Sequence, residues 1–236
     1  MHQIKKIAAL ALCLSSVAAF ATPLVPQYDS FGPLAAATFS GSGIPNNPVA
    51  ITSFGSGDTA VTIGLSATGR YTGNASGAPG VLGGNGSGVF YGPNGISSKP
   101  SDAVGDNLAR WNFDFYIGGA GLSQYTYALS VTRNPGDLVP LYVDITSLTL
   151  GAADSVNPAV PNTIQNSENL GFGTNFATFD PRAAGDYGFM LTATDRAGVV
   201  HTSAILVDVA AVPEPASLAL VGIALVGLAA SRRRKS

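Results

Sequence analysis

The residues that could carry catalytic chemistry are few once the two ends of the chain are set aside. A serine hydrolase needs a histidine base beside its nucleophile, and His201 is the single histidine beyond the N-terminal segment. No Gly-x-Ser-x-Gly turn occurs, and the one cysteine, Cys13, lies in the N-terminal segment. We therefore expect His201 to be a solvated strand residue and the protein to be non-enzymatic.

Carboxylates are plentiful, but they stand where aspartate usually forms turns. Paired carboxylates could hydrolyse glycosides, and carboxylate and carbonyl oxygens could bind calcium. Glu168 is the only glutamate between the two ends, and most aspartates lie beside Gly, Pro or Asn, which is typical of turns. The calcium candidates are Asp102, Asp106 and Asn107, although turn formation explains them without a metal. We predict no metal site and no cofactor.

Aromatic side chains that could stack on sugar rings alternate with polar residues along the chain. Four of them share their faces with aliphatic residues such as Ile117 and Leu129, so we predict that they pack in a core: Trp111, Phe113, Tyr125 and Tyr127. Tyr116 lies on the opposite face with Asp114. It is the aromatic residue we expect to be exposed.

The elements that would position these residues are β-strands. Apolar and polar residues alternate with a period of two in 108–117, 124–132 and 187–193, and no part of the body has a sustained helical period. Gly118, Gly119 and Gly121 predict a hairpin between the first two stretches. The sequence Asp195-Arg196-Ala197-Gly198 predicts a tight turn before a returning strand. Further strands are expected at 59–65, 88–91 and 141–145.

This pattern predicts an all-β fold, an antiparallel β-sandwich of the Ig-like or jelly-roll-like kind with one face of each sheet in water. The stretch 179–198 resembles the penultimate hairpin of bacterial Ig-like and cadherin-like sandwich domains, with an Asp-Pro corner and a Gly-x-Tyr entry to a strand. The resemblance implies a hairpin over 179–209 near the C-terminal edge of the sandwich. Ten glycines in 69–95 predict a surface excursion.

The charge of the body argues against nucleic-acid binding. Between the two ends, six Lys and Arg residues oppose thirteen acids, which are the chain's fourteen acids less Glu214. The clustered basic residues all lie in the two ends, so the body offers no surface that would follow phosphates. We predict no nucleic-acid partner.

The N-terminal segment has the parts of a secretory signal peptide. Lys5 and Lys6 precede a short apolar core, and Ala19 and Ala21 are the small residues that signal peptidase requires. We expect a signal helix over 1–21, removed after Ala21, and therefore an exported protein.

The C-terminal segment has the parts of a single membrane helix. Residues 216–230 are apolar apart from Ser217; as a helix they would span about 22 Å, which is short of the ~30 Å hydrocarbon core. The basic cluster that follows would stay in the cytoplasm and extend the span by snorkelling: Arg232, Arg233, Arg234 and Lys235. We predict a helix over 216–231 and an extracellular body over 22–211.

A proline-bracketed motif stands immediately before this helix. The residues Val212-Pro213-Glu214-Pro215, the apolar helix and the basic cluster resemble a PEP-CTERM sorting signal, which here would occupy 212–236. The resemblance implies recognition by an exosortase, a membrane enzyme that removes the tail. It also implies a Gram-negative bacterium that makes exopolysaccharide. The chain would be anchored in the membrane only until it is cut.

The sequence therefore predicts an exported protein of the cell surface or extracellular matrix with a structural or adhesive role, associated with exopolysaccharide and biofilm. Its processing partners would be signal peptidase and an exosortase-like enzyme. Two alternatives stay open. One is a calcium-dependent lectin or a carbohydrate-active protein, and the other is a permanently anchored envelope protein.

Overall fold

The computed structural model describes residues 24–70, 80–97, 107–134, 143–144, 162–172 and 179–210. The predicted signal helix, sorting motif, membrane helix and basic cluster lie outside these ranges, as do Asp102 and Asp106. The strands and short 3-10 turns are β1 (Ser30–Gly32), β2 (Val49–Phe54), η1 (Gly57–Thr59), β3 (Val61–Gly69), β4 (Gly80–Val81), β5 (Gly83–Gly84), β6 (Val89–Gly92), β7 (Trp111–Gly118), η2 (Leu122–Gln124), β8 (Tyr125–Asn134), β9 (Val143–Asp144), β10 (Thr163–Glu168), β11 (Gly185–Asp195) and β12 (Val200–Val209).

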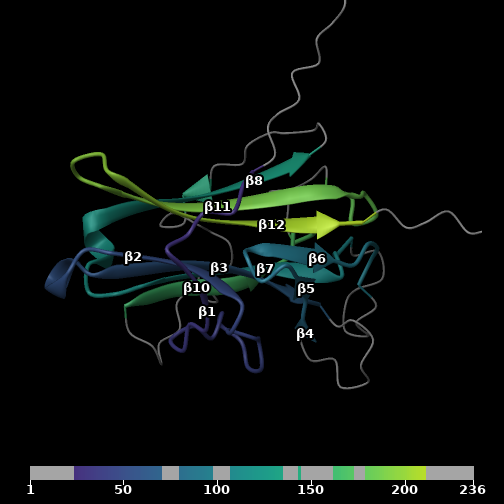
Figure 1. The fold of residues 1–236 in the computed structure, drawn as a ribbon, viewed down its shortest axis with the longest axis horizontal. Helices are drawn as coiled ribbons and strands as arrows, with labels where there is room; N and C mark the ends of the chain where they lie inside the picture. Colours follow the sequence, from purple (N-terminus) through teal and green to yellow (C-terminus); the bar gives the residue numbers. More distant parts are fainter. Residues whose placement is uncertain are drawn as a thin grey trace, which may run out of the picture.

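The strands form two sheets that pack face to face, which confirms the predicted β-rich, sandwich-like body (Figure 1). The first sheet has the order β1-β2-β3-β7-β10, with β4 also paired to β3, and the second has the order β5-β6-β12-β11-β8-β9. All described pairs are antiparallel except β6 with β12, which is parallel. The second sheet is therefore mixed. The prediction from the alternating pattern that all strands pair antiparallel is wrong for this pair.

The core lies between the two inner faces and follows the predicted alternation. Trp111, Phe113, Phe115 and Ile117 of β7 point inward and are buried, as are Tyr127 and Leu129 of β8. The rings of Phe113 and Phe189 stack across the core with centroids 4.6 Å apart. The interpretation of these aromatic residues as core rather than as a sugar platform is confirmed.

The predicted hairpin between β7 and β8 is wrong, because the two strands belong to different sheets. The connection crosses from one layer to the other and runs close to the backbone before β3. A Cβ atom on Gly119 would lie 2.2 Å from the Ala60 carbonyl oxygen, and one on Gly121 would lie 2.4 Å from that of Thr59. The glycines are needed for this close approach rather than for a two-strand turn.

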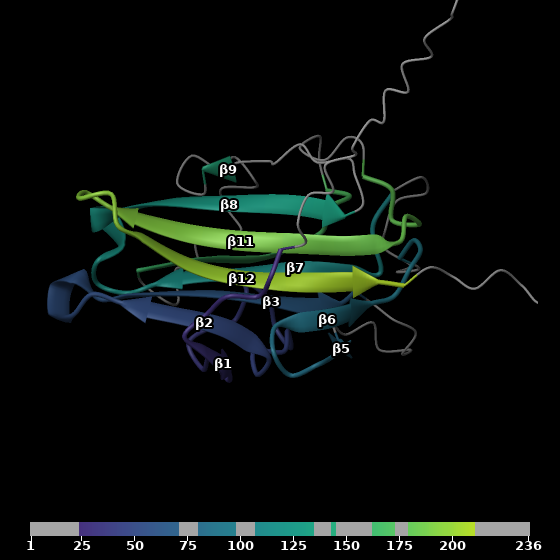
Figure 2. The same ribbon diagram turned by 45° about the horizontal axis from the view of Figure 1, so that its top comes forward.

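The predicted hairpin of β11 and β12 is confirmed, but it lies in the middle of its sheet and not at an edge (Figure 2). The two strands pair in register from Gly185 with Val209 to Thr194 with Val200. The Asp195 carboxylate closes the turn by accepting hydrogen bonds from the Ala197 and Val199 amides, both at 2.8 Å. The aspartate is therefore a turn former, as predicted.

The described parts of the glycine-rich stretch 69–95 form strands that belong to both sheets. The prediction that this stretch is a surface excursion is wrong for those parts. β4 extends the first sheet by pairing with the end of β3. β5 and β6 then extend the second sheet, where β6 runs parallel to the last four residues of β12. The stretch thus carries the chain from one layer to the other; residues 71–79 lie outside the described ranges.

A loop of residues 33–48, which we call the covering loop, packs on the outer face of the first sheet. Its Phe39 forms a second buried cluster with Val49 and with Tyr116 of β7. Tyr116 is therefore 5% exposed, and the prediction that it is the exposed aromatic residue is wrong. The alternating pattern correctly placed Tyr116 on the outer face of β7. It could not show that the covering loop shields this outer face from water.

The edge of β12 that precedes its pairing with β6 is joined to the first sheet by two side-chain hydroxyl groups. Ser203 donates to the carbonyl of Ala50, and Thr52 donates to the carbonyl of Thr202, both at 2.8 Å. Beside them Gln27 pairs with Ala204 as an isolated bridge, and the N-terminal segment crosses β12 there (Figure 2). These contacts cover backbone groups that would otherwise form an open edge.

Candidate functional site

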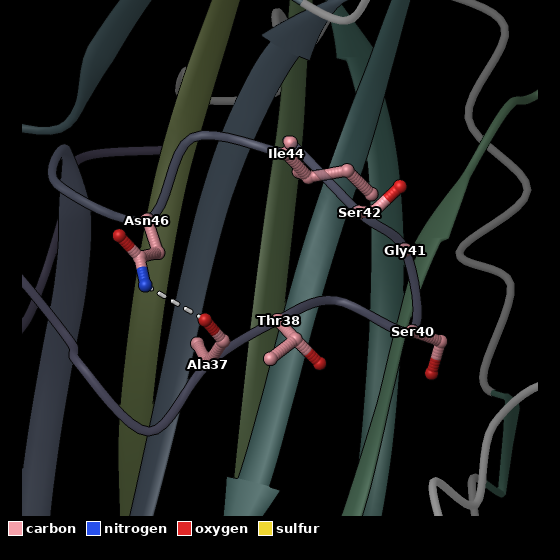
Figure 3. A pocket seen from close by; sticks show the side chains of 8 residues that line it. Ala37, Thr38, Ser40, Gly41, Ser42, Ile44 and Asn46 are labelled. Atoms are coloured by element: carbon pink, nitrogen blue, oxygen red, sulfur yellow. Dashed lines mark hydrogen bonds between the residues drawn. The ribbon is translucent and has the colours of Figure 1, made fainter.

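A hollow in the described part of the chain lies within the covering loop. It encloses about 550 Å³ between the two arms of the loop, and Figure 3 shows it opening above the strands of the first sheet. Its wall is made by Ala37, Thr38, Ser40, Gly41, Ser42, Gly43, Ile44 and Asn46. The Asn46 side-chain amide donates to the Ala37 carbonyl at 2.8 Å and joins the two arms (Figure 3).

A buried glutamine of β10 holds the covering loop in place. The Gln165 side-chain oxygen accepts hydrogen bonds from the amides of Thr38 and Phe39, at 2.8 and 2.9 Å. The Ser40 hydroxyl donates to the Gln165 backbone carbonyl at 2.5 Å. Gln165 is fully buried. Three hydrogen bonds therefore fix the loop to the sheet, and the one from the Phe39 amide is itself buried.

The backbone of the covering loop is strained at its tip. Phe39 and Ser40 have φ angles of 48° and 56°, in the left-handed region that costs about 1–2 kcal/mol for a residue with a Cβ atom. The burial of the Phe39 ring and the contacts of Gln165 offset this cost.

The lining of the hollow is neutral and mixes polar side chains with apolar ones such as Ala37 and Ile44. Hydroxyl and amide groups line it and no charged side chain does, so it provides neither the ligands of a metal ion nor the cations that bind phosphate. The Thr38 hydroxyl and the Gln165 side-chain nitrogen are buried and have no hydrogen-bond partner among the described residues. A neutral ligand rich in hydroxyl groups suits such a surface.

A second polar feature is the buried carboxyl group of Asp114, on the outer face of β7. The side chain is fully buried, its Oδ1 accepts a hydrogen bond from the Thr68 hydroxyl at 3.3 Å, and its Oδ2 has no hydrogen-bond partner among the described residues. Burial raises its pKa to about 7, against the smaller lowering effect of hydrogen bonds from Ser167 and Thr68. This group is neutral over most of the acidic range.

Residues that the sequence singled out for chemistry do not come together. His201 is half-buried on β12 and its ring stacks on that of Phe54, with centroids 4.0 Å apart. Of the calcium candidates only Asn107 is described, and its side-chain amide donates to the Phe179 carbonyl. Within the described ranges no three His, Cys, Asp or Glu side chains form a group that could hold a metal.

Gln165 and the covering loop, which together shape the hollow, had no clear signal in the sequence. The segment of β10 reads Thr-Ile-Gln-Asn-Ser-Glu, with one aliphatic residue and no apolar alternation, so Gln165 was not predicted to lie on a strand or to be buried. The covering loop is an irregular segment whose packing depends on Tyr116 of a distant strand.

The C-terminal junction is the other functional feature that the structure positions. β12 ends at Val209, which is 2% exposed and pairs with Gly185 on one side and Gly92 on the other. Ala210 is the last described residue and is exposed. The tail thus begins directly at the end of a central strand.

Comparison with known families identifies this tail. Residues 211–235 match the PEP-CTERM protein-sorting motif. No curated protein and no solved structure matches the chain. No helix in the described part of the chain is long and apolar enough to cross a membrane. The chain carries a PEP-CTERM sorting motif, and it is therefore an exported protein that an exosortase processes.

Proposed function

We propose that this protein is a non-enzymatic component of the cell surface or extracellular matrix of a Gram-negative bacterium, with a structural or adhesive role toward exopolysaccharide. The observation that carries the proposal is the sorting motif joined directly to a β-sandwich-like body. The four aromatic residues that alternation placed inward lie in or against its core, whereas Tyr91 of β6 is 51% exposed. The proposal is also supported by the half-buried position of His201, which stacks on Phe54 as a packing residue.

A carbohydrate-binding protein is the second candidate, and the hollow of the covering loop favours it. Gln165 anchors the loop that forms the hollow, and the lining includes neutral hydroxyl and amide groups that can exchange hydrogen bonds with the hydroxyl groups of a sugar. A serine nucleophile at the hollow would need a base beside it, and the wall offers the hydroxyl groups of Ser40 and Ser42 without a His, Asp, Glu or Lys side chain.

The processing part of the proposal is tested by intact-mass analysis of the protein from its native host. We expect a chain that begins at Thr22 and ends near Pro213–Pro215. A main mature species that still ends in Ser236 would contradict removal of the tail and would favour a permanently anchored envelope protein.

The functional part is tested with the processed protein and the host's own polysaccharide, with calcium and with a chelator. We expect weak, metal-independent binding and no cleavage of the polymer. Turnover of the polymer would overturn the non-enzymatic role. Binding that the chelator abolishes would instead identify a calcium-dependent lectin.

A further inference from the structure

Three side chains form a row across the outer face of the second sheet, where β12 lies between β11 and β6 (Figure 2). Asp208 of β12 is directly opposite Asp186 of β11 and, on its other side, level with Tyr91 of β6. Their neighbours along the strands, such as Val207, are buried in the core, so these three side chains share the outer face. Neighbouring strands lie about 4.8 Å apart, which makes this outer row about 10 Å long.

The strands hold the outer row in a fixed arrangement. Residues 206–209 of β12 are paired with β11 on one side and with β6 on the other. Val207 and Val209 anchor the same stretch in the main core cluster. A ligand that binds to a row built on paired strands loses little free energy to ordering of the protein.

The open surface around Tyr91 is a narrow strip. The Tyr91 side chain is 51% exposed, and it pairs with Gly83 of β5, whose missing Cβ atom would lie 3.7 Å from the Tyr91 Cδ2. One row further back, the N-terminal segment covers the sheet, since a Cβ atom on Gly188 would lie 2.9 Å from the Leu24 Cβ. Such a strip suits a single extended polymer better than a globular partner, which needs about 800 Å².

The two aspartates leave negative charge in the outer row without a cation beside it. Burial and, to a smaller extent, the charge of Asp208 raise the pKa of Asp186. Within the described ranges neither carboxylate accepts a hydrogen bond or forms an ion pair. Arg133 of the adjacent β8 is directed elsewhere: it donates to the Ala184 carbonyl at 3.4 Å and lies 5.7 Å from the centroid of the Tyr187 ring. A positively charged ligand group would relieve the repulsion between the two carboxylates.

We propose that the outer row binds an amino sugar of a polysaccharide, with a sugar ring against Tyr91 and its ammonium group at Asp208 and Asp186. The ammonium donates charge-assisted hydrogen bonds to the carboxylates and is attracted by the face of the aromatic ring. The proposal rests on the proposed association with exopolysaccharide and names the class of sugar, one with free amino groups. The site is separate from the hollow of the covering loop.

The choice of ligand is tested by calorimetric titration of the processed protein with two matched probes, a tetramer of glucosamine and a tetramer of N-acetylglucosamine. The acetyl groups remove the positive charge, so we expect the glucosamine tetramer to bind about tenfold tighter or more. Equal affinities would overturn the proposal. So would a lysine tetrapeptide that binds as tightly as the glucosamine tetramer, because a sugar ring would then not be required, or binding of the tetramer that is lost with a chelator.

The location of the site is tested with substitutions in the outer row. Tyr91→Ala and Asp208→Asn should each weaken binding of the glucosamine tetramer about tenfold, whereas Tyr91→Phe keeps the ring and should bind like wild type. Asp58→Asn removes an exposed carboxylate of η1 and should have no effect. Urea unfolding followed by the fluorescence of Trp111 confirms that each variant is folded. Unchanged affinity in both Tyr91→Ala and Asp208→Asn would overturn the proposal.

The host's own polysaccharide separates this site from the proposed function. If wild type binds that polymer and Tyr91→Ala and Asp208→Asn bind it equally well, the adhesive role stands and the outer row is not the site. If the glucosamine tetramer binds at the outer row and the host's polymer does not bind, the site stands and the adhesive role toward that polymer fails.

Discussion

Replacing Asp114 with asparagine should abolish a loss of stability that the wild-type protein undergoes as the pH rises. The Asp114 side chain is fully buried, and hydrogen bonds from Thr68 and Ser167 are its described polar contacts. An asparagine has nearly the same shape and keeps an oxygen that can accept the Thr68 hydrogen bond. The substitution therefore removes the ionisation and little else.

The magnitude follows from the pKa of the carboxyl, which burial raises from its ordinary 3.8 to about 7. Below the lower value both folded and unfolded chains hold the proton, so the contribution of Asp114 to stability is fully present. As the pH rises further, the unfolded chain releases the proton first and the free energy of unfolding falls by about 1.4 kcal/mol per pH unit. The loss is complete above the folded pKa and amounts to about 4 kcal/mol.

The assay is urea unfolding of the processed protein between pH 4 and pH 8, followed by the fluorescence of Trp111, the one tryptophan of the chain. We expect Asp114→Asn to match wild type within about 1 kcal/mol at pH 4 and to be more stable by several kcal/mol at pH 8. The matched control, Asp58→Asn, removes an exposed carboxylate and should follow wild type. Parallel pH profiles for wild type and Asp114→Asn would refute the argument.

Three further substitutions test the contacts that hold the body together. Gln165→Leu removes the acceptor of two covering-loop amides and should cost about 2–4 kcal/mol in unfolding free energy, with faster hydrogen exchange confined to the covering loop. Ser203→Ala leaves the Ala50 carbonyl without its donor and should cost about 1–2 kcal/mol by urea unfolding; no change would mean that the seal of β12 is unimportant. Tyr187→Phe removes a 2.8 Å hydrogen bond to the Ala183 carbonyl and should cost about 1 kcal/mol by thermal unfolding.

The faces of the long strands could be predicted because alternation is a local property. Most residues of β7 and β8 that the pattern placed inward are buried in the core, and Tyr125 is partly buried against it. The turn at Asp195 is formed by the aspartate itself. The pairing of β7 and β8 could not be predicted in this way. Two strands with equally apolar inner faces can lie side by side in one sheet or face each other across a sandwich, and the same alternation results.

The hollow and the buried acid escaped prediction for a related reason. The polar residues on the outer face of β7 indicated a surface in water, yet Asp114 is fully buried and Tyr116 is covered by Phe39. Burial of that face depends on a loop that is remote in sequence and is anchored by Gln165 of another strand. No local pattern records such a contact.

The sequence by itself determined that the chain carries a sorting motif, because such a motif is a contiguous stretch of residues. It also determined the class of fold, because the period of two is set by the backbone of a strand. Only the tertiary structure decided which strands are neighbours, that Asp114 is buried, and that the pair before the end of the β11–β12 ladder sets Asp186 against Asp208. These are contacts between residues distant in the chain, and the free energy that selects them arises only when the sheets pack.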